Sequence, residues 1–237
     1  MGMTSSDRSS VVDPHRVVWS APIEELPERH LVVLLHGYGS DARDLMNIVP
    51  QLPNEPIYAS LLAPAPCGAS PLGYEWFPLH FDAQGALLDA SSPERLAAFA
   101  KAADAAAQGV LEWIDALPAA PKSVSLLGFS QGGIVSLAAV RRAPERFRTV
   151  AVQSTLVAPD VHGLDAEVAR VKPSAWWGRG TADTVIPAEA IPVTEAWMQA
   201  CANAELYVDE GVGHVFSVEG LRALSAYLRE HLNLGEE

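Results

Sequence analysis

The stretch Val124-Ser125-Leu126-Leu127-Gly128-Phe129-Ser130-Gln131-Gly132-Gly133 decides the fold. It begins as an apolar run typical of a strand buried on both faces, passes through G-x-S-x-G, and continues as a helical pattern. In that context the motif predicts a sharp turn from strand to helix with Ser130 at its tip. Glycines flank the serine because a Cβ atom would collide with the neighbouring backbone in so tight a turn. Ser130 is therefore a candidate nucleophile at the carboxyl edge of a sheet.

On both sides of this motif, short β-branched apolar runs alternate with longer Ala-rich stretches. The alternation predicts an α/β fold in which helices cover both faces of a mostly parallel central sheet. The expected strands are Leu31 to Leu35, Ile57 to Leu62, Ser123 to Leu127, Thr149 to Gln153, Ser174 to Trp177 and Glu205 to Val208. The expected helices are Ala42 to Val49, Pro93 to Ala116, Gln131 to Arg142, Ala188 to Cys201 and Val215 to Leu232.

The 237 residues contain no internal repeat and no interdomain linker, so we expect one domain over 1–237. Its first 29 residues are read as an N-terminal extension or as an edge strand around Val17 to Ser20. Two long irregular stretches, Ala63 to Pro78 and Thr155 to Pro173, are expected to be loops beside a site. The second lies in a connection of about 20 residues, too short for a large cap domain.

Composition and charge exclude several classes of function. The formal net charge is −13, which repels phosphate backbones on average, so nucleic acid is not an expected partner. No apolar run has the length of a signal-peptide core or a membrane span, which predicts a cytoplasmic protein without membrane insertion. Cys67 and Cys201 form no C-x-x-C or Cys/His cluster, so neither a disulfide framework nor a metal site is expected.

A serine hydroxyl needs a general base and a carboxylate that orients it, and this kind of fold supplies them in the chain order Ser, Asp or Glu, His. Among the seven histidines, His214 in Gly211-Val212-Gly213-His214 follows an expected strand and precedes the last helix, so it is the candidate base. Asp183 follows the preceding strand and is the candidate carboxylate. Asp209 is the rival, although it lies only five residues before His214 and would have to double back.

A candidate oxyanion hole completes the set. Its donors are the backbone amide of Gln131, directly after the nucleophile, and that of Tyr38 in Leu35-His36-Gly37-Tyr38-Gly39-Ser40. The competing interpretation of Gly37-x-Gly39 is a dinucleotide-binding loop. Position 42 is alanine where that motif continues with glycine, which disfavours this alternative.

These blocks resemble the carboxylesterase, acyl-protein thioesterase and lysophospholipase family of small α/β-hydrolases. The matching segments run in family order and are His36-Gly37-Tyr38-Gly39 with Asp41, Ala63-Pro64-Ala65-Pro66, Trp76-Phe77, Gly128-Phe129-Ser130-Gln131-Gly132-Gly133, Gly180-Thr181-Ala182-Asp183 and Gly211-Val212-Gly213-His214. The resemblance implies the α/β-hydrolase fold without a large cap, and it implies Trp76 and Leu156 as residues of the acyl pocket. Two positions depart from the family pattern: Arg179 stands where a histidine is usual, and Pro78 where an acidic residue often follows Trp-Phe.

Together the residues predict a serine hydrolase that cleaves a small-molecule ester or thioester through an acyl-enzyme on Ser130, with no cofactor. Two alternatives stay open: an acyltransferase that uses the same site, and a catalytically silent binding protein of the same fold. The oligomeric state, monomer or homodimer, also stays open.

Overall fold

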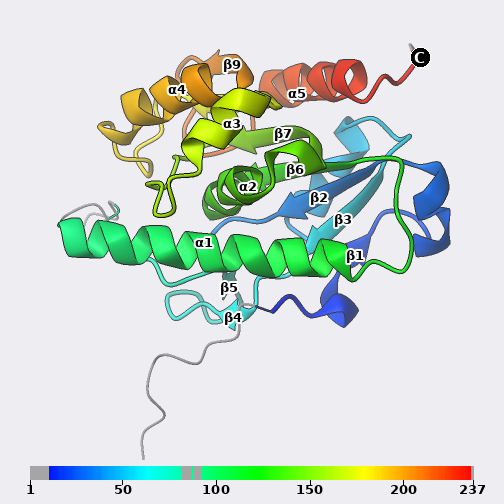
Figure 1. Ribbon diagram of the computed structural model, residues 1–237, viewed down its shortest axis with the longest axis horizontal. Helices are drawn as coiled ribbons and strands as arrows, with labels where there is room; N and C mark the ends of the chain where they lie inside the picture. The colour runs from blue at the N-terminus through cyan, green and yellow to red at the C-terminus, as the bar shows by residue number, and fades with distance from the viewer. Residues whose placement is uncertain (1–10, 82–86, 88–91, 236–237) are drawn as a thin grey trace, which may run out of the picture.

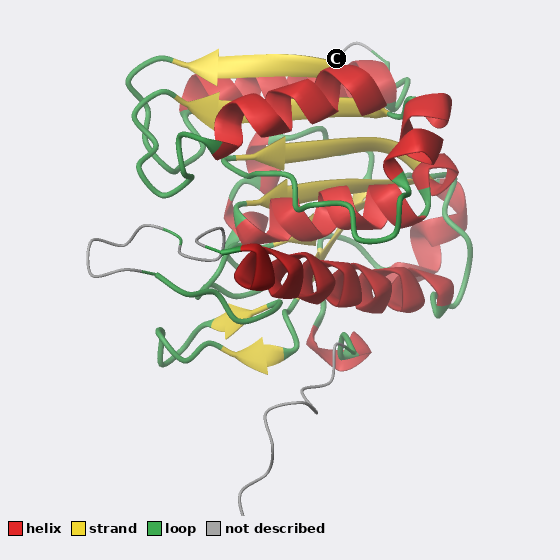
Figure 2. Ribbon diagram, turned by 60° about the vertical axis from the view of Figure 1, so that its left-hand side comes forward, coloured by secondary structure: helices red, strands yellow, loops and turns green. Residues whose placement is uncertain are grey.

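Seven strands form the central sheet of the computed structural model, which describes residues 11–81, 87 and 92–235. The strand order is β1-β3-β2-β6-β7-β8-β9, and every neighbouring pair is parallel except β1 with β3. Because the parallel strands share one direction, their carboxyl ends lie along one edge, and loops gather there in Figure 2. This mostly parallel α/β sheet confirms the expected fold class.

The strands follow the apolar runs of the sequence. Their bounds are β1 Val18–Trp19, β2 Leu31–Leu35, β3 Ile57–Leu61, β6 Val124–Phe129, β7 Phe147–Gln153, β8 Ser174–Gly180 and β9 Asn203–Asp209. All residues of β2 and β3 are buried, as the lack of polar alternation predicts, whereas β9 is an edge strand with mixed exposure. The expected edge strand near Val17 is β1, which pairs with β3.

Helices cover the two faces of the sheet unequally. On one face lie α1 (Pro93–Asp115), α2 (Gln131–Arg142), α3 (Asp165–Val171) and α4 (Ala190–Cys201), all in front of the strands in Figure 1. The other face is covered by α5 (Val218–His231) and by two short 3-10 turns, η3 (Leu45–Asn47) and η4 (Val49–Gln51). Each face packs its own apolar cluster, so the sheet separates two cores.

The expected helix over Ala42 to Val49 is wrong: the segment contains η3 and the start of η4. Eight residues before Pro50 are few for an α-helix, and the Asp41 carboxylate bonds the amide of Arg43 instead, which favours a turn.

Two regular elements lie inside stretches expected to be loops. The hairpin of β4 (Ala65–Pro66) and β5 (Tyr74–Glu75) belongs to the Ala63 to Pro78 segment. Helix α3 belongs to the connection between β7 and β8, and it is the only helix there, so this connection supplies no large cap over the carboxyl edge.

Candidate active site

Ser130 occupies the predicted turn between β6 and α2. Its backbone has φ 52° and ψ −117°, a conformation that non-glycine residues rarely adopt and that is costly unless neighbours hold it. Two hydrogen bonds do so: the Ser130 amide donates to Gln153 O at 3.0 Å, and Thr155 Oγ1 donates to Ser130 O at 2.8 Å. The strained serine therefore projects from the carboxyl edge, where the G-x-S-x-G pattern predicts it.

The flanking glycines are required by close backbone approaches. A Cβ on Gly128 would lie 2.5 Å from Gly132 O, and a Cβ on Gly132 would lie 1.9 Å from Leu35 O. Helix α2 can therefore start directly against β2 and the loop that follows it only because these two positions lack side chains.

His214 and Asp183 meet, as the sequence predicts. His214 Nδ1 lies 2.7 Å from Asp183 Oδ2, and the other carboxylate oxygen accepts the amides of Val185 at 2.9 Å and Ile186 at 3.1 Å. Burial raises the pKa of Asp183, but the bond from His214 and these two amides outweigh burial and hold this pKa below its usual value. Asp183 is thus an anion that fixes the Nδ1-H tautomer and leaves Nε2 free to accept a proton.

The loops that carry these two residues are joined to each other. The Ala182 amide donates to Val212 O at 2.9 Å, which joins the two loops, and Gln153 Nε2 donates to Val215 O at 3.0 Å, which ties the His214 loop to the end of β7. Gly180 makes the first contact possible, since a Cβ there would lie 2.0 Å from Val212 O. Arg179, the departure from the family pattern, lies over the Trp177 ring at 5.9 Å and does not break this arrangement.

The rival carboxylate Asp209 serves a different partner. Its Oδ2 accepts a short hydrogen bond from the Ser217 hydroxyl, and Ser217 Oγ in turn accepts the Gly220 amide at 2.8 Å. Asp209 therefore supports the N-cap of α5.

The loop that carries Tyr38 is fixed from beneath by His36. The Ala63 amide donates to His36 Nε2 at 3.1 Å, so the imidazole proton is on Nδ1, which donates to Gly37 O at 2.8 Å. Burial lowers the pKa of His36, which keeps the ring neutral and suits this pattern. Sequence analysis did not single out His36, although its place directly after a buried strand was a usable signal.

The segment around β5 fixes both candidate oxyanion donors. Gly39 N donates to Tyr74 O at 2.9 Å, which holds the Tyr38 loop. The Gln131 side chain, in a residue only 1% exposed, accepts the Trp76 amide at 3.0 Å and donates to Phe77 O at 2.7 Å. The first residue of a helix has no acceptor within that helix, so the Gln131 amide is available to a ligand.

Trp76, expected in the acyl pocket, does not line the cavity in the described part of the chain. The residue is 4% exposed, and its indole N–H donates to His36 O at 2.9 Å because a buried indole needs an acceptor. Trp76 therefore packs behind the Tyr38 loop, and only Leu156 of the two expected pocket residues reaches the cavity.

A cavity of about 260 Å³ is lined by the candidate residues other than Asp183 and Trp76. Ser130, His214, Gln131, Tyr38 and Leu156 all line it. Next to it lies an apolar cavity of about 200 Å³ with Phe99 and Val193 in its wall, and the two cavities share Leu87 and Leu156. The site thus combines a reactive centre with an apolar extension toward α1 and α4.

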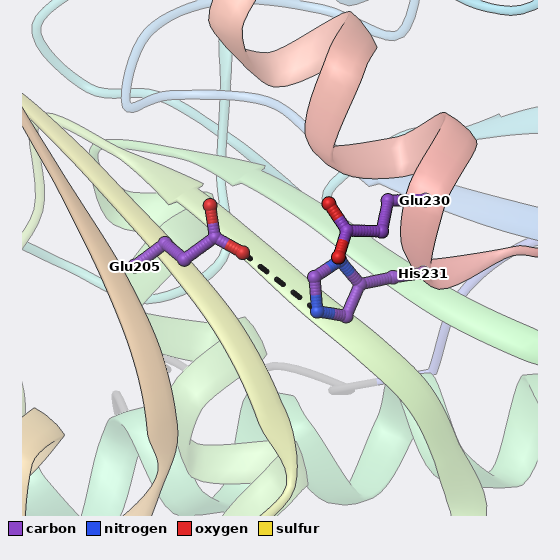
Figure 3. Close-up of side chains that lie close together, drawn as sticks. All are labelled: Glu205, Glu230 and His231. Atoms are coloured by element: carbon purple, nitrogen blue, oxygen red, sulfur yellow. Dashed lines mark ion pairs between the residues drawn. The ribbon is translucent and has the colours of Figure 1, made fainter.

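A separate cluster of titratable groups lies on β9 and α5 (Figure 3). The ligand atoms of Glu205, Glu230 and His231 lie within 4.8 Å of one another, with His231 Nε2 3.8 Å from Glu205 Oε1. His231 Nδ1 is engaged by Tyr227 O at 3.0 Å, and both glutamates are exposed, so we interpret the cluster as a surface ion pair.

Solved structures with the same architecture cover nearly the whole chain. Esterase PE8 is 26% identical with a TM-score of 0.70, covering 91% of this chain and 98% of that one. Acyl-protein thioesterase 2 of Zea mays is 17% identical with a TM-score of 0.71, covering 92% and 99%, which shows a shared fold. Together with the strand order and the strained serine turn, these similarities define an α/β-hydrolase fold.

The family follows from sequence comparison. A model of the phospholipase/carboxylesterase family matches residues 20–232, so the chain belongs to that family. A probable carboxylesterase of Oryza sativa subsp. japonica is 32% identical over 129 residues, which are 53% of this chain and 47% of that protein. The match therefore spans about half the length of that curated relative. Within the described residues, no helix has both the length and the apolar character needed to cross a membrane.

Proposed function

We propose that the protein is a serine hydrolase that cleaves carboxylic esters or thioesters through an acyl-enzyme on Ser130. The observation that carries this proposal is the 2.7 Å contact between His214 Nδ1 and Asp183 Oδ2, in a cavity that Ser130 also lines. An imidazole held in this tautomer presents Nε2 as a base, and Ser130, strained at the turn before α2, lines the same cavity as His214.

The reaction proceeds in two halves. His214 takes the Ser130 proton while Oγ attacks the substrate carbonyl carbon, and the resulting oxyanion accepts hydrogen bonds from the Tyr38 and Gln131 amides. As the carbonyl re-forms, the bond to the leaving oxygen or sulfur breaks, and His214 Nε2 returns the proton to that atom. Water then attacks the carbonyl carbon of the acyl-Ser130 ester while His214 takes a proton from it. The bond to Ser130 Oγ breaks, the carboxylic acid is released, and His214 returns the proton to Ser130 Oγ.

The two donor amides belong to rigid surroundings, which supports their role. The Gln131 carboxamide and the Gly39 to Tyr74 bond hold both amides before any substrate binds. Donors fixed in advance need no reorganisation as negative charge develops, and one such donor accounts for about 10²- to 10³-fold in kcat.

Turnover of p-nitrophenyl butyrate tests the proposal. The wild-type protein should release p-nitrophenolate well above the uncatalysed rate, and Ser130→Ala should lose at least about 10³-fold of that activity while keeping its fold by circular dichroism. Equal rates for the wild type and Ser130→Ala would refute an acyl-enzyme on Ser130.

A further inference from the structure

The cavity at Ser130 continues in a second, polar direction. Ser40 and Asp44 line both the 260 Å³ cavity at Ser130, which we call the reaction cavity, and an adjoining groove of about 330 Å³. The groove runs between the turn at Gly39 and the loop at Ser70, and its wall is mostly polar, with Asp41, Arg43 and Asn47 beyond Asp44. A substrate bound across Ser130 can therefore extend in two directions. One is the apolar cavity between α1 and α4, which we call the apolar exit, and the other is this groove, which we call the polar exit.

Elements from opposite faces of the sheet border the two exits. The apolar cavity is bordered by α1 and the start of α4, which belong to the core of one face. Asp44 leads directly into η3, whose Leu45 packs in the core of the other face with α5. His214 lies on that second side as well, because its loop enters α5 and its ring contacts Phe129, which packs with that core.

The position of His214 decides which half of the substrate takes the polar exit. In the proposed reaction the leaving oxygen or sulfur receives its proton from His214 Nε2, so the leaving group must lie on the His214 side. That side is the one with the groove at Asp44. The acyl chain then takes the apolar exit.

Asp44 is the only carboxylate among the described residues that line the reaction cavity. Its Oδ2 accepts the Ser40 hydroxyl at 2.6 Å, which fixes the carboxylate at the entrance of the groove. Arg43 lines the groove but not the reaction cavity, so Asp44 is the nearer charge to the scissile bond.

We propose that the groove past Asp44 is the leaving-group subsite, and that the Asp44 carboxylate selects cationic and neutral leaving groups over anionic ones. The inference rests on the proposed hydrolase function and assigns one end of its substrate. At separations near 4 Å in a solvated site, one unit charge changes a rate by about five-fold, and salt reduces the effect.

Three thioesters with one acyl group test the proposal. Butyrylthiocholine carries a cation, S-(3,3-dimethylbutyl) thiobutyrate is its neutral isostere, and S-(3-sulfonatopropyl) thiobutyrate carries an anion. We compare kcat/KM of the wild type with Asp44→Asn for each thioester, so that differences in thiol reactivity cancel. The control is Glu28→Gln, which removes one charge from an exposed residue shortly before β2. This residue lies at the amino-terminal ends of the parallel strands, whereas the cavity lies at their carboxyl ends.

Asp44→Asn should lower kcat/KM for the cation about five-fold, raise it about five-fold for the anion, and leave the neutral isostere within two-fold. These changes should shrink at 0.5 M salt, and Glu28→Gln should leave all three substrates within two-fold. If Asp44→Asn changes the cation and the anion by the same factor, the subsite assignment is wrong while the hydrolase function stands. If the wild type cleaves none of the three faster than Ser130→Ala does, the hydrolase proposal itself fails, and the subsite falls with it.

Discussion

At the scale of single residues, the two carboxylates near His214 have different tasks. Asp183 accepts the His214 ring and two backbone amides, whereas Asp209 accepts the hydroxyl that caps α5. Each carboxylate is occupied by its own partner, so exchanging their roles would require the loops to rearrange. Replacing either by asparagine keeps the volume and removes the charge, which makes the two variants a matched pair.

Asp183→Asn should lower kcat on the order of 10⁴-fold, because an amide can hold the imidazole in the wrong tautomer and cannot stabilise its positive charge. Asp209→Asn should leave kcat within about three-fold and cost about 1 kcal/mol of stability through the weakened helix cap. Steady-state hydrolysis of p-nitrophenyl butyrate and urea unfolding measure the two effects. A damaged Asp209→Asn beside a fully active Asp183→Asn would reverse our assignment.

The dependence of kcat/KM on pH should show a single acidic limb. His214 must be neutral to accept the Ser130 proton, so activity should rise with pH over the mildly acidic range. The pKa of Asp183 is held below its usual value, so this carboxylate is already ionised there and adds no second limb. A log–log slope near two in the acidic range would indicate a second essential proton and contradict this account.

Much of the candidate site is predictable from the sequence because each residue follows a strand or a motif in a fixed order. Ser130, Asp183 and His214 come from loops at the carboxyl ends of β6, β8 and β9. The role of the Gln131 side chain and the buried place of Trp76 are not predictable, because they depend on hydrogen bonds between segments 40 to 55 residues apart. A tryptophan beside a site motif can equally line a cavity or support its wall, and only the acceptor of its indole decides.

At the scale of elements, the close start of α2 against β2 limits which residues the turn tolerates. Gly132→Ala should destabilise the protein by about 2 to 4 kcal/mol or prevent soluble expression, since its Cβ would meet Leu35 O at 1.9 Å. Gly68→Ala is the matched control, because nothing lies within 4 Å of a Cβ there. Thermal unfolding measures both variants. Equal melting temperatures for Gly132→Ala and the wild type would show that the two elements can move apart.

Element prediction succeeded where a strong local signal marks the element and failed for a short helix that contacts distant in sequence support. The span predicted for α2, Gln131 to Arg142, matches the structure, because a whole turn-to-helix signal precedes it. The seven residues of α3 were assigned to a loop. Arg141 bonds the Asp165 carboxylate at 2.7 Å, and Trp197 donates to the same oxygen, so contacts distant in sequence support this short helix.

At the scale of the whole molecule, the connection from β7 to β8 contains α3 as its one helix and provides no large cap over the carboxyl edge. The apolar exit offers about 200 Å³ beyond the reaction cavity. Each methylene of the acyl chain that enters this cavity contributes about 0.8 kcal/mol of binding free energy through burial. The gain stops once the acyl chain passes Val193 and emerges into water.

For p-nitrophenyl esters of increasing chain length, kcat/KM should therefore climb through short and medium acyl groups and then level or fall. No activation at a lipid interface is expected, because no cap has to open. Rates for a chain-length series, measured below and above the critical micelle concentration, check both statements. A sharp rise above that concentration, or a preference for long-chain triglycerides, would show that the connection from β7 to β8 acts as a lid.

The central claim is that Ser130 is the nucleophile, activated by His214 and oriented by Asp183. The most direct measurement is the intact mass of the folded protein after reaction with a fluorophosphonate, followed by peptide mapping of the adduct. We predict one adduct per chain on Ser130, absent from Ser130→Ala and formed far more slowly by Asp183→Asn. Folded wild-type protein without an adduct, or an adduct of equal yield on Ser130→Ala, would contradict the claim.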